Sequence, residues 1–110
     1  MNRLIIALLG SVLYSGASMA QKQTYFTNPV IHGDVADPSI LRIDDTYYAT
    51  GTSSEWAPSY PVFTSKDLVN WKQTGHVFEQ QPEWTKSSFW APEWYYHNGK
   101  VYVYYTARKK

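Results

Sequence analysis

The sequence predicts an all-β fold. After Ala20 there is little of the 3.6-residue apolar periodicity of helices, and short runs of β-branched and aromatic residues alternate with Gly, Pro, Asn and Asp. The pattern also repeats, because placing Pro38 over Pro92, an offset of 54 residues, aligns the turns and aromatic residues that follow. Repeats of this size are typical of β-propeller blades, although two unrelated hairpins in a sandwich remain the alternative on the repeat alone.

Residues 1–20 are predicted to be a secretory signal peptide. Arg3 supplies a positive charge, residues 4–13 an apolar run, and Ser18-Met19-Ala20 a small-x-small cleavage pattern. The run is shorter than the roughly 20 residues that a membrane-spanning helix needs. We therefore expect a secreted or periplasmic protein that begins at Gln21 and has no membrane attachment after cleavage.

The first repeat is expected to form four strands. A turn at Asp44-Asp45 joins the first two, and a polar connection, in which Asp67 and Asn70 bond backbone groups and Trp71 packs between sheets, joins the last two. The expected strands are residues 39–43, 46–52, 61–65 and 71–77.

The second repeat is expected to supply one hairpin. A connection over residues 78–88 leads to strands at 94–97 and 100–107, joined by Asn98-Gly99, a pair that readily forms a type I′ turn. The whole is about one and a half blades. Since such a piece leaves an apolar face and a strand edge uncovered, we expect it to be part of a longer chain.

Composition narrows the classes of partner. Of the ten Lys and Arg, Arg3 lies in the predicted signal, which leaves nine against nine Asp and Glu, so no nucleic-acid or other polyanion partner is implied. There is no cysteine for disulfides or metal ligation, and the histidines show no metal-ligand spacing, so no zinc site and no cofactor are expected. The sequence does not indicate whether a calcium ion lies on the axis of a propeller. The many aromatic residues suit sheet faces, carbohydrate stacking, or both.

Two aspartates precede the first predicted strand. In the segment 32–40, Asp34 and Asp37 come just before apolar residues, and Pro38 restricts the backbone directly after Asp37. A carboxylate held in this way suits a general base, whereas Asp-Pro is also an ordinary strand-initiating turn. The segment alone leaves both interpretations open.

An ordered series of segments resembles the N-terminal part of glycoside hydrolase family 43. The segments are Asn-Pro-Val-Ile at 28–31, His-Gly-Asp-Val-Ala-Asp-Pro at 32–38, Tyr-Tyr at 47–48, Ser-Lys-Asp-Leu-Val-Asn-Trp at 65–71 and Phe-Trp-Ala-Pro-Glu at 89–93. The resemblance implies a five-bladed β-propeller with a pocket on its axis, hydrolysis with inversion, and Asp37 as the general base. Asp34 is then expected to organise the loop.

Further residues are predicted to contact the sugar. The resemblance implies that Trp90 lines the pocket and that Glu93, where the family more often has Asp, supports it; core packing is the alternative for Trp90. His32 is expected either to bond a substrate hydroxyl or to cap its loop. Trp56 and Tyr60 are expected either at the pocket rim or shielding a blade edge.

The resemblance implies an enzyme that acts on oligo- or polysaccharides of the plant cell wall, with β-xylose or α-L-arabinofuranose as the released sugar. Its general acid and a second aspartate are expected on later blades, because Glu55, Glu79 and Glu83 do not lie in matching segments. The 110 residues alone are expected to be inactive. A non-catalytic carbohydrate-binding fragment and a fructan-cleaving propeller hydrolase are the alternatives, and the sequence does not indicate the oligomeric state.

Overall fold

The computed structural model describes residues 25–110, so the predicted signal peptide lies outside the described residues. The described part consists of strands and connections with no helix, which confirms the all-β prediction, and accordingly none of it is a helix that could cross a membrane. The six strands are β1 (Ser39–Ile43), β2 (Thr46–Thr50), β3 (Ser59–Ser65), β4 (Lys72–Phe78), β5 (Thr85–His97) and β6 (Lys100–Lys109).

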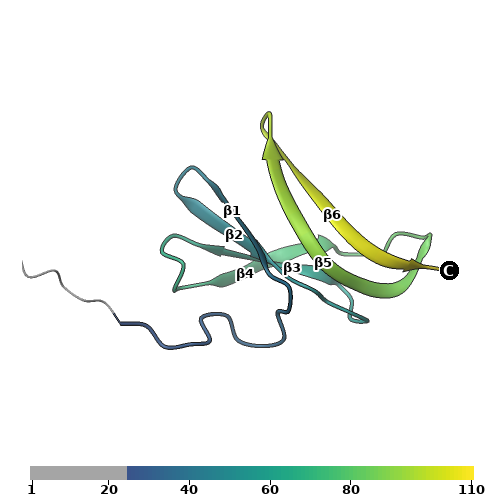
Figure 1. Cartoon of the computed structure of the whole chain (residues 1–110), viewed down its shortest axis with the longest axis horizontal. Coiled ribbons are helices and arrows are strands. Elements are labelled where there is room, and N and C mark those ends of the chain that lie inside the picture. The colour runs from purple at the N-terminus through teal and green to yellow at the C-terminus, as the bar shows by residue number, and fades with distance from the viewer. Residues whose placement is uncertain (1–24) are drawn as a thin grey trace, which may run out of the picture.

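The strands form two sheets (Figure 1). Strands β1 to β4 make an antiparallel sheet in the order of the sequence, which we call the first unit. Strands β5 and β6 make a long, curved hairpin, the second unit, and β5 contacts both β1 and β3. This is the predicted arrangement of one complete blade and the start of the next.

The 54-residue repeat is confirmed by strand register. Every residue pair between β1 and β2 recurs between β5 and β6 when 54 is added to both residue numbers. The recurring pairs are 39–50 with 93–104, 40–49 with 94–103, 41–48 with 95–102, 42–47 with 96–101 and 43–46 with 97–100. The two hairpins are therefore the same structural element, which two unrelated hairpins in a sandwich would not explain.

The hairpin turns lie where the sequence predicts them. Asn98 and Gly99 have φ angles of 48° and 74°, and two positive φ angles define the type I′ turn. In the first unit Asp44 has a φ of 53° and joins β1 to β2. Aspartate and asparagine tolerate this left-handed backbone better than other non-glycine residues.

The predicted boundary of β5 is wrong. The expected connection over residues 78–88 is shorter, and β5 begins at Thr85 rather than at Trp94. Its first half pairs with β6 through three register shifts, the last of them between Trp90 and Glu93 around Pro92. Such bulges accommodate a proline within a strand, and they also hide the strand from a search for regular alternation.

Other boundaries shift by smaller amounts. Strand β2 ends at Thr50 instead of residue 52, β3 begins at Ser59 instead of Pro61, β4 lies one residue later than expected, and β6 continues to Lys109 instead of ending at residue 107. Thr52 is released from β2 because its backbone bonds the loop before β1 instead of β3.

An aromatic cluster joins the two units. Tyr60 and Phe78 come from the first unit and Phe89 and Tyr105 from the second, with ring centroids 5.7 Å apart for Tyr60–Phe89 and 5.0 Å apart for Phe78–Tyr105. The Tyr60 hydroxyl lies 3.2 Å from the Trp90 carbonyl oxygen and 3.0 Å from that of Thr106. Burial raises the pKa of Tyr60 well above its usual value, so its hydroxyl remains a donor. The cluster therefore holds the start of β5 against the first unit. Because Tyr60 is fully buried in it, the prediction of Tyr60 at the pocket rim is wrong.

The β3–β4 connection is organised by Asp67, as predicted. Its Oδ1 accepts hydrogen bonds from the backbone amides of Val69 and Asn70 at 2.9 and 2.7 Å. The prediction for Asn70 is wrong in detail, because its side chain donates to Asp67 Oδ2 at 2.7 Å rather than to the backbone. Trp71 donates its indole N–H to the Leu68 carbonyl at 2.9 Å.

Candidate active site

Asp37 ends the loop that leads into β1. Its side chain is exposed, and its φ of 48° is left-handed, which is unusual for a residue that precedes proline. The Thr52 hydroxyl donates a hydrogen bond to Asp37 Oδ2 at 2.9 Å. Among the described residues, none donates to Oδ1. One oxygen of the carboxylate is thus held by the protein while the other remains available.

Thr52 also contacts the second unit. The backbone N–H of Ala91 donates to Thr52 Oγ1 at 2.8 Å. Ala91 occupies the place in the second repeat that Asp37 occupies in the first, and it too has a left-handed φ, 44°, before a proline. A single hydroxyl group therefore bonds the side chain of one residue and the backbone of its repeat equivalent.

The backbone around Thr52 is closely packed. The Thr52 N–H donates to the Ala36 carbonyl at 2.8 Å. A Cβ atom on Gly51 would lie 2.6 Å from Val35 Cγ1 and 2.9 Å from the Ala36 oxygen, so only glycine permits this approach. Residues 51 and 52 thereby fix the loop that carries Asp37.

The next two residues along the chain, Ser53 and Ser54, form backbone hydrogen bonds to the second unit. The amides of Ser53 and Ser54 both lie 3.1 Å from the Phe89 carbonyl oxygen, and Phe89 returns its own N–H to the Ser54 carbonyl at 2.9 Å. Residues 51–54 are consequently held between the loop before β1 and the start of β5. The predicted base lies at this junction between the units.

A hollow of about 160 Å³ borders the junction. Trp56 lies on its wall, with 76% of its surface exposed, which is a position open to a ligand. Asp34 lines the same hollow together with Thr52, and a loop-organising hydrogen bond predicted for Asp34 is not among those of the described residues. The remaining lining residues are Ser53, Pro58, Pro61 and His76.

The other predicted site residues, Trp90, Glu93 and His32, have exposed side chains. Trp90 immediately precedes Ala91 and is half exposed. Glu93 is exposed on β5, on the face opposite that of the buried Trp94. His32 is exposed in the loop before β1, and within the described residues no hydrogen bond joins it to Asp37. The structure therefore brings Asp37 next to the segment of Trp90 but does not link it to His32 or Glu93.

Two of the remaining glutamates have other partners. Glu55 accepts a hydrogen bond from the Ser88 hydroxyl at 3.1 Å, and Glu79 lies 3.7 Å from the His76 ring. In the part of the chain that the structure describes, no cluster of three His, Cys, Asp or Glu side chains could hold a metal ion.

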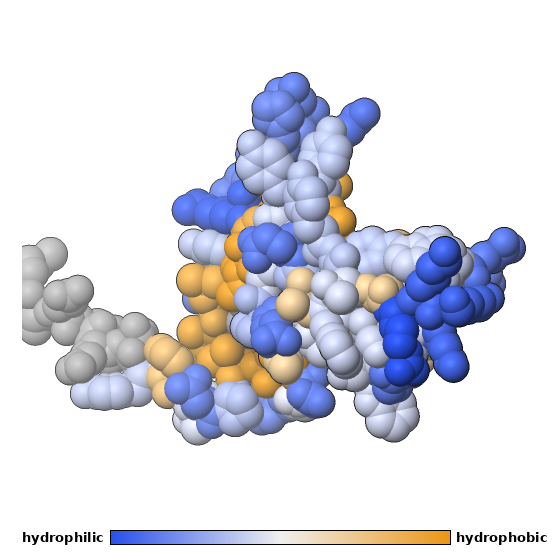
Figure 2. Space-filling model, turned by 45° about the vertical axis from the view of Figure 1, so that its right-hand side comes forward, coloured by the Kyte–Doolittle hydropathy of each residue, from blue (hydrophilic) through white to orange (hydrophobic). Residues whose placement is uncertain are grey.

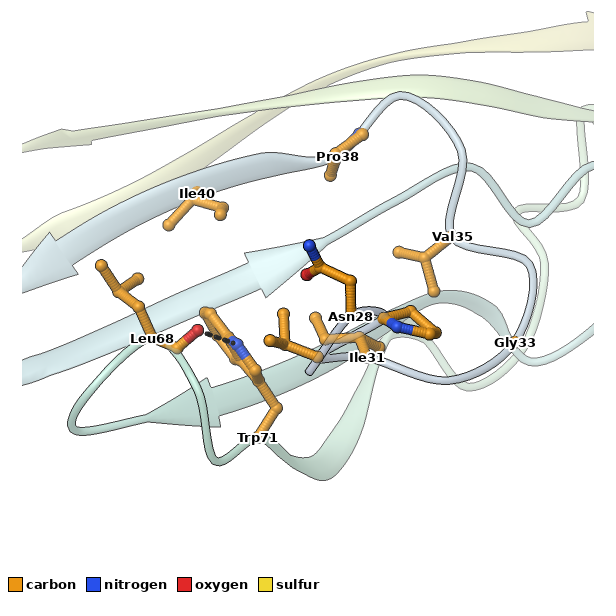
Figure 3. A pocket seen from close by; sticks show the side chains of 10 residues that line it. Asn28, Ile31, Gly33, Val35, Pro38, Ile40, Leu68 and Trp71 are labelled. Carbon is orange, nitrogen blue, oxygen red and sulfur yellow. Dashed lines mark hydrogen bonds between the residues drawn. The ribbon is translucent and has the colours of Figure 1, made fainter. Parts of the chain in front are cut away.

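A larger hollow of about 630 Å³ is lined by residues of the loop before β1, by Ile40 of β1 and by the β3–β4 connection (Figure 3). In the figure Val35 and Pro38 face Leu68 and Trp71 across it, with Ile40 of β1 beside them. Its ten lining residues carry no ionisable side chain, so this hollow offers no group for acid or base catalysis. Figure 2 shows that hydrophobic side chains gather on the side of the molecule where the N-terminal segment lies.

Thr52 is the residue that the sequence alone did not single out. It was expected to be the last residue of a strand, where a hydroxyl has no particular role. The 54-residue offset aligns Thr52 with Thr106 and Ala36 with Trp90. Thr106 pairs with Trp90 in the second unit, just as the backbone of Thr52 bonds that of Ala36 in the first. That alignment predicts where its backbone lies but not that its side chain reaches Asp37.

Comparison with known proteins extends the same pattern. The model of glycosyl hydrolases family 43 matches residues 26–110. A non-reducing-end α-L-arabinofuranosidase of Bacteroides ovatus is 39% identical over 92% of this chain and 20% of its own length, and a β-xylosidase of Formosa agariphila is 37% identical over 72% of this chain and 15% of its own. The crystal structure of a xylan β-1,4-xylosidase from Bacillus halodurans is 32% identical, with a TM-score of 0.70 over 78% of this chain and 18% of that one.

The chain corresponds to only a part of each of these relatives. The chain spans about a fifth or less of the length of these relatives, and its four-stranded sheet and hairpin match part of their five-bladed propellers. The match of the family model covers almost all the described residues, including Asp37 and its contacts. The chain therefore belongs to glycosyl hydrolases family 43.

Proposed function

We propose that this chain forms the base-bearing part of an exported, inverting glycoside hydrolase that removes β-xylose or α-L-arabinofuranose units from plant cell-wall polysaccharides. Relatives named as arabinofuranosidases and xylosidases support the two sugars. The observation that carries the proposal is the Asp37 carboxylate, held by Thr52 through Oδ2 at the junction of the two units.

Asp37 would act as the general base. Its Oδ1 accepts a proton from a water molecule, and that water attacks the anomeric carbon from the face opposite the leaving group. In inverting enzymes the acid and base carboxyl groups stand roughly 6.5–9.5 Å apart, which leaves room for the water. The acid that protonates the leaving oxygen is proposed to lie outside residues 25–110. Without that acid, the rate of hydrolysis would be lower by about a hundredfold to ten-thousandfold.

The aromatic side chains would orient the sugar. Trp90 and Trp56 are both at least half exposed, and Trp56 lines a hollow together with Thr52. An indole face stacks on the apolar face of a sugar ring and so adds binding without reacting. We assign to Trp90 the sugar that is cleaved and to Trp56 the neighbouring unit of the polysaccharide.

The test uses the product of the complete open reading frame that contains these residues. Turnover of nitrophenyl β-xyloside or nitrophenyl α-L-arabinofuranoside is expected for the wild type. Asp37→Asn should lower kcat by at least about a thousandfold without changing the thermal midpoint, since a positioned base supplies at least part of the catalysis. Asp34→Asn is the matched control and should retain most of the activity. Undiminished turnover by Asp37→Asn would remove Asp37 from the mechanism.

Export is a separate part of the proposal. It rests on the charged, apolar and small-residue pattern of residues 1–20. N-terminal sequencing of protein recovered outside the cytoplasm is expected to begin at Gln21. Recovery of protein that still begins at Met1 from the cytoplasm alone would refute export.

The exposed Trp56 beside a hollow also favours a second candidate, carbohydrate binding without catalysis. This candidate requires that residues 21–110 bind xylo- or arabino-oligosaccharides on their own. Isothermal titration of that segment decides between the two. Heat of binding that disappears in Trp56→Ala would support a binding module, and its absence would leave the hydrolase.

A further inference from the structure

The Thr52 hydroxyl has a single proton, and its neighbours determine where that proton points. A backbone amide can only donate, so the Ala91 N–H, 2.8 Å away, occupies a lone pair of Thr52 Oγ1. The hydroxyl proton is then directed to Asp37 Oδ2, 2.9 Å away. The carboxylate is bonded by a group whose own direction is set from the second unit.

The Thr52 backbone reinforces this geometry. Its N–H donates to the Ala36 carbonyl, directly before Asp37, and the amide of the next residue, Ser53, donates to the Phe89 carbonyl of the second unit. The position of Oγ1 is therefore determined from both sides. A change in how Phe89 and Ala91 pack on the first unit would therefore change the orientation of the Asp37 carboxylate.

Asp37 and Ala91 both need such support. Their φ angles of 48° and 44° belong to a region that non-glycine residues rarely occupy, and each precedes a proline. Backbone strain of this kind persists only where surrounding contacts hold it. Thr52 contacts both strained residues, which gives its side chain a role that a strand residue of the same type would not have.

We propose that Thr52 is the positioning residue of the base, because its hydroxyl couples the orientation of the Asp37 carboxylate to the seating of the second unit on the first. The inference rests on the proposed function and adds a named residue to it. A hydrogen bond to Oδ2 restricts rotation of the carboxyl group. It therefore keeps Oδ1 turned toward the water that attacks the sugar.

The test is Thr52→Val in the full-length protein, because valine keeps the shape of threonine but has neither donor nor acceptor. Steady-state kinetics on the nitrophenyl glycoside that the wild type cleaves should show kcat lower by about tenfold to a hundredfold, the loss expected when a catalytic group is misplaced. KM should stay within about twofold of the wild type, since the base does not bind the sugar ring.

Two variants separate positioning from packing. Thr52→Ser retains the hydroxyl and should recover most of the kcat that valine loses. Thr50→Val makes the same substitution two residues earlier, at a buried hydroxyl that has no hydrogen-bond partner among the described residues, and should leave kcat unchanged. If Thr52→Val does not fold, Thr52→Ala against Thr52→Ser makes the same comparison.

The outcomes are distinguishable. Loss of kcat in Thr52→Val with recovery in Thr52→Ser and no change in Thr50→Val supports the inference. Wild-type kcat in folded Thr52→Val, or equal losses in Thr52→Ser or Thr50→Val, overturns it while the proposed function survives if Asp37→Asn is inactive. Full activity of Asp37→Asn overturns the base assignment and the inference with it.

Discussion

Asp37 and Ala91 hold the same place in two repeats, and both have a left-handed backbone before a proline. Only Asp37 carries a carboxylate there. Ala91 instead donates its backbone N–H to the Thr52 hydroxyl, which in turn donates to the Asp37 carboxylate. The two repeats thus have the same backbone conformation at this position, and only the side chain at the position distinguishes the roles of the two residues. At the scale of the residue, the site is built from a difference between two otherwise equivalent positions.

The charge of Asp67 predicts a pH dependence of stability. Hydrogen bonds from the Asn70 amide, the Asn70 side chain and the Val69 amide hold the pKa of Asp67 well below its usual range. Because the pKa is depressed in the folded state, Asp67 stabilises the fold at pH values above its unfolded pKa, about 3.9, and this contribution is lost as pH falls through the folded value. Asp67→Ala should lower the thermal midpoint at pH 7, and the difference from wild type should shrink below about pH 4.

Thermal melts followed by circular dichroism between pH 2 and pH 7 measure this difference. Asp67→Asn is the control, because it keeps an acceptor oxygen for the two amides but loses the charge. It should lie between Ala and wild type at pH 7. A difference between Asp67→Ala and wild type that stays constant over the whole pH range would show that the carboxylate charge plays no part.

At the scale of the element, the segment 51–54 connects the Asp37 loop to β5 through backbone hydrogen bonds to both. Gly51→Ala places a Cβ 2.6 Å from Val35 Cγ1 and 2.9 Å from the Ala36 carbonyl oxygen, which belongs to the backbone and cannot turn aside as the end of a flexible side chain could. Overpacking of this kind costs about 1–3 kcal/mol, and it should also reduce kcat because the loop that it displaces carries Asp37. Thermal melts and steady-state kinetics measure the two effects.

Gly75 in β4 is the matched control for Gly51. A Cβ at Gly75 meets no atom within 4 Å, so Gly75→Ala should change stability by less than about 0.5 kcal/mol and leave kcat unchanged. Equal behaviour of the two alanine variants would mean that the close approach at Gly51 does not hold the loop.

The strands were predictable where local chemistry decides. Strand β1 has the predicted bounds, Ser39–Ile43, and the Asn98-Gly99 turn is where its backbone preference places it. The start of β5 was not predictable, because Ser87, Ser88 and Pro92 interrupt the alternation and the strand forms only through bulged pairing with β6. Pairing with a partner distant in sequence leaves little trace in the local pattern.

The site was predictable to a similar degree. The ordered motifs single out Asp37 and Trp90, and the structure places their segments on either side of Thr52. Thr52 itself lies 15 residues from one partner and 39 from the other, so neither contact follows from sequence spacing. The roles of Asp37, Trp90, Trp56, His32 and Glu93 all remain predictions, and no described hydrogen bond connects His32 or Glu93 to Asp37.

At the scale of the whole molecule, the junction between the units carries both stability and the site. The aromatic cluster of Tyr60, Phe78, Phe89 and Tyr105 presses β5 onto the first unit, and Tyr60 bonds the carbonyl of Trp90 beside Ala91. Aromatic pairs of this kind contribute about 0.5–1.5 kcal/mol each beyond the area they bury. The orientation of Asp37 thus depends on the packing of one repeat against the next.

The central claim is that Asp37 is the general base, and chemical rescue tests it most directly. In Asp37→Gly a water molecule can no longer be activated, whereas azide is a nucleophile that needs no base. We predict that the full-length Asp37→Gly variant loses turnover in buffer and regains it with added azide. NMR should then identify a glycosyl azide with inverted anomeric configuration. Wild-type turnover without azide, or an azide product with retained configuration, would contradict this account.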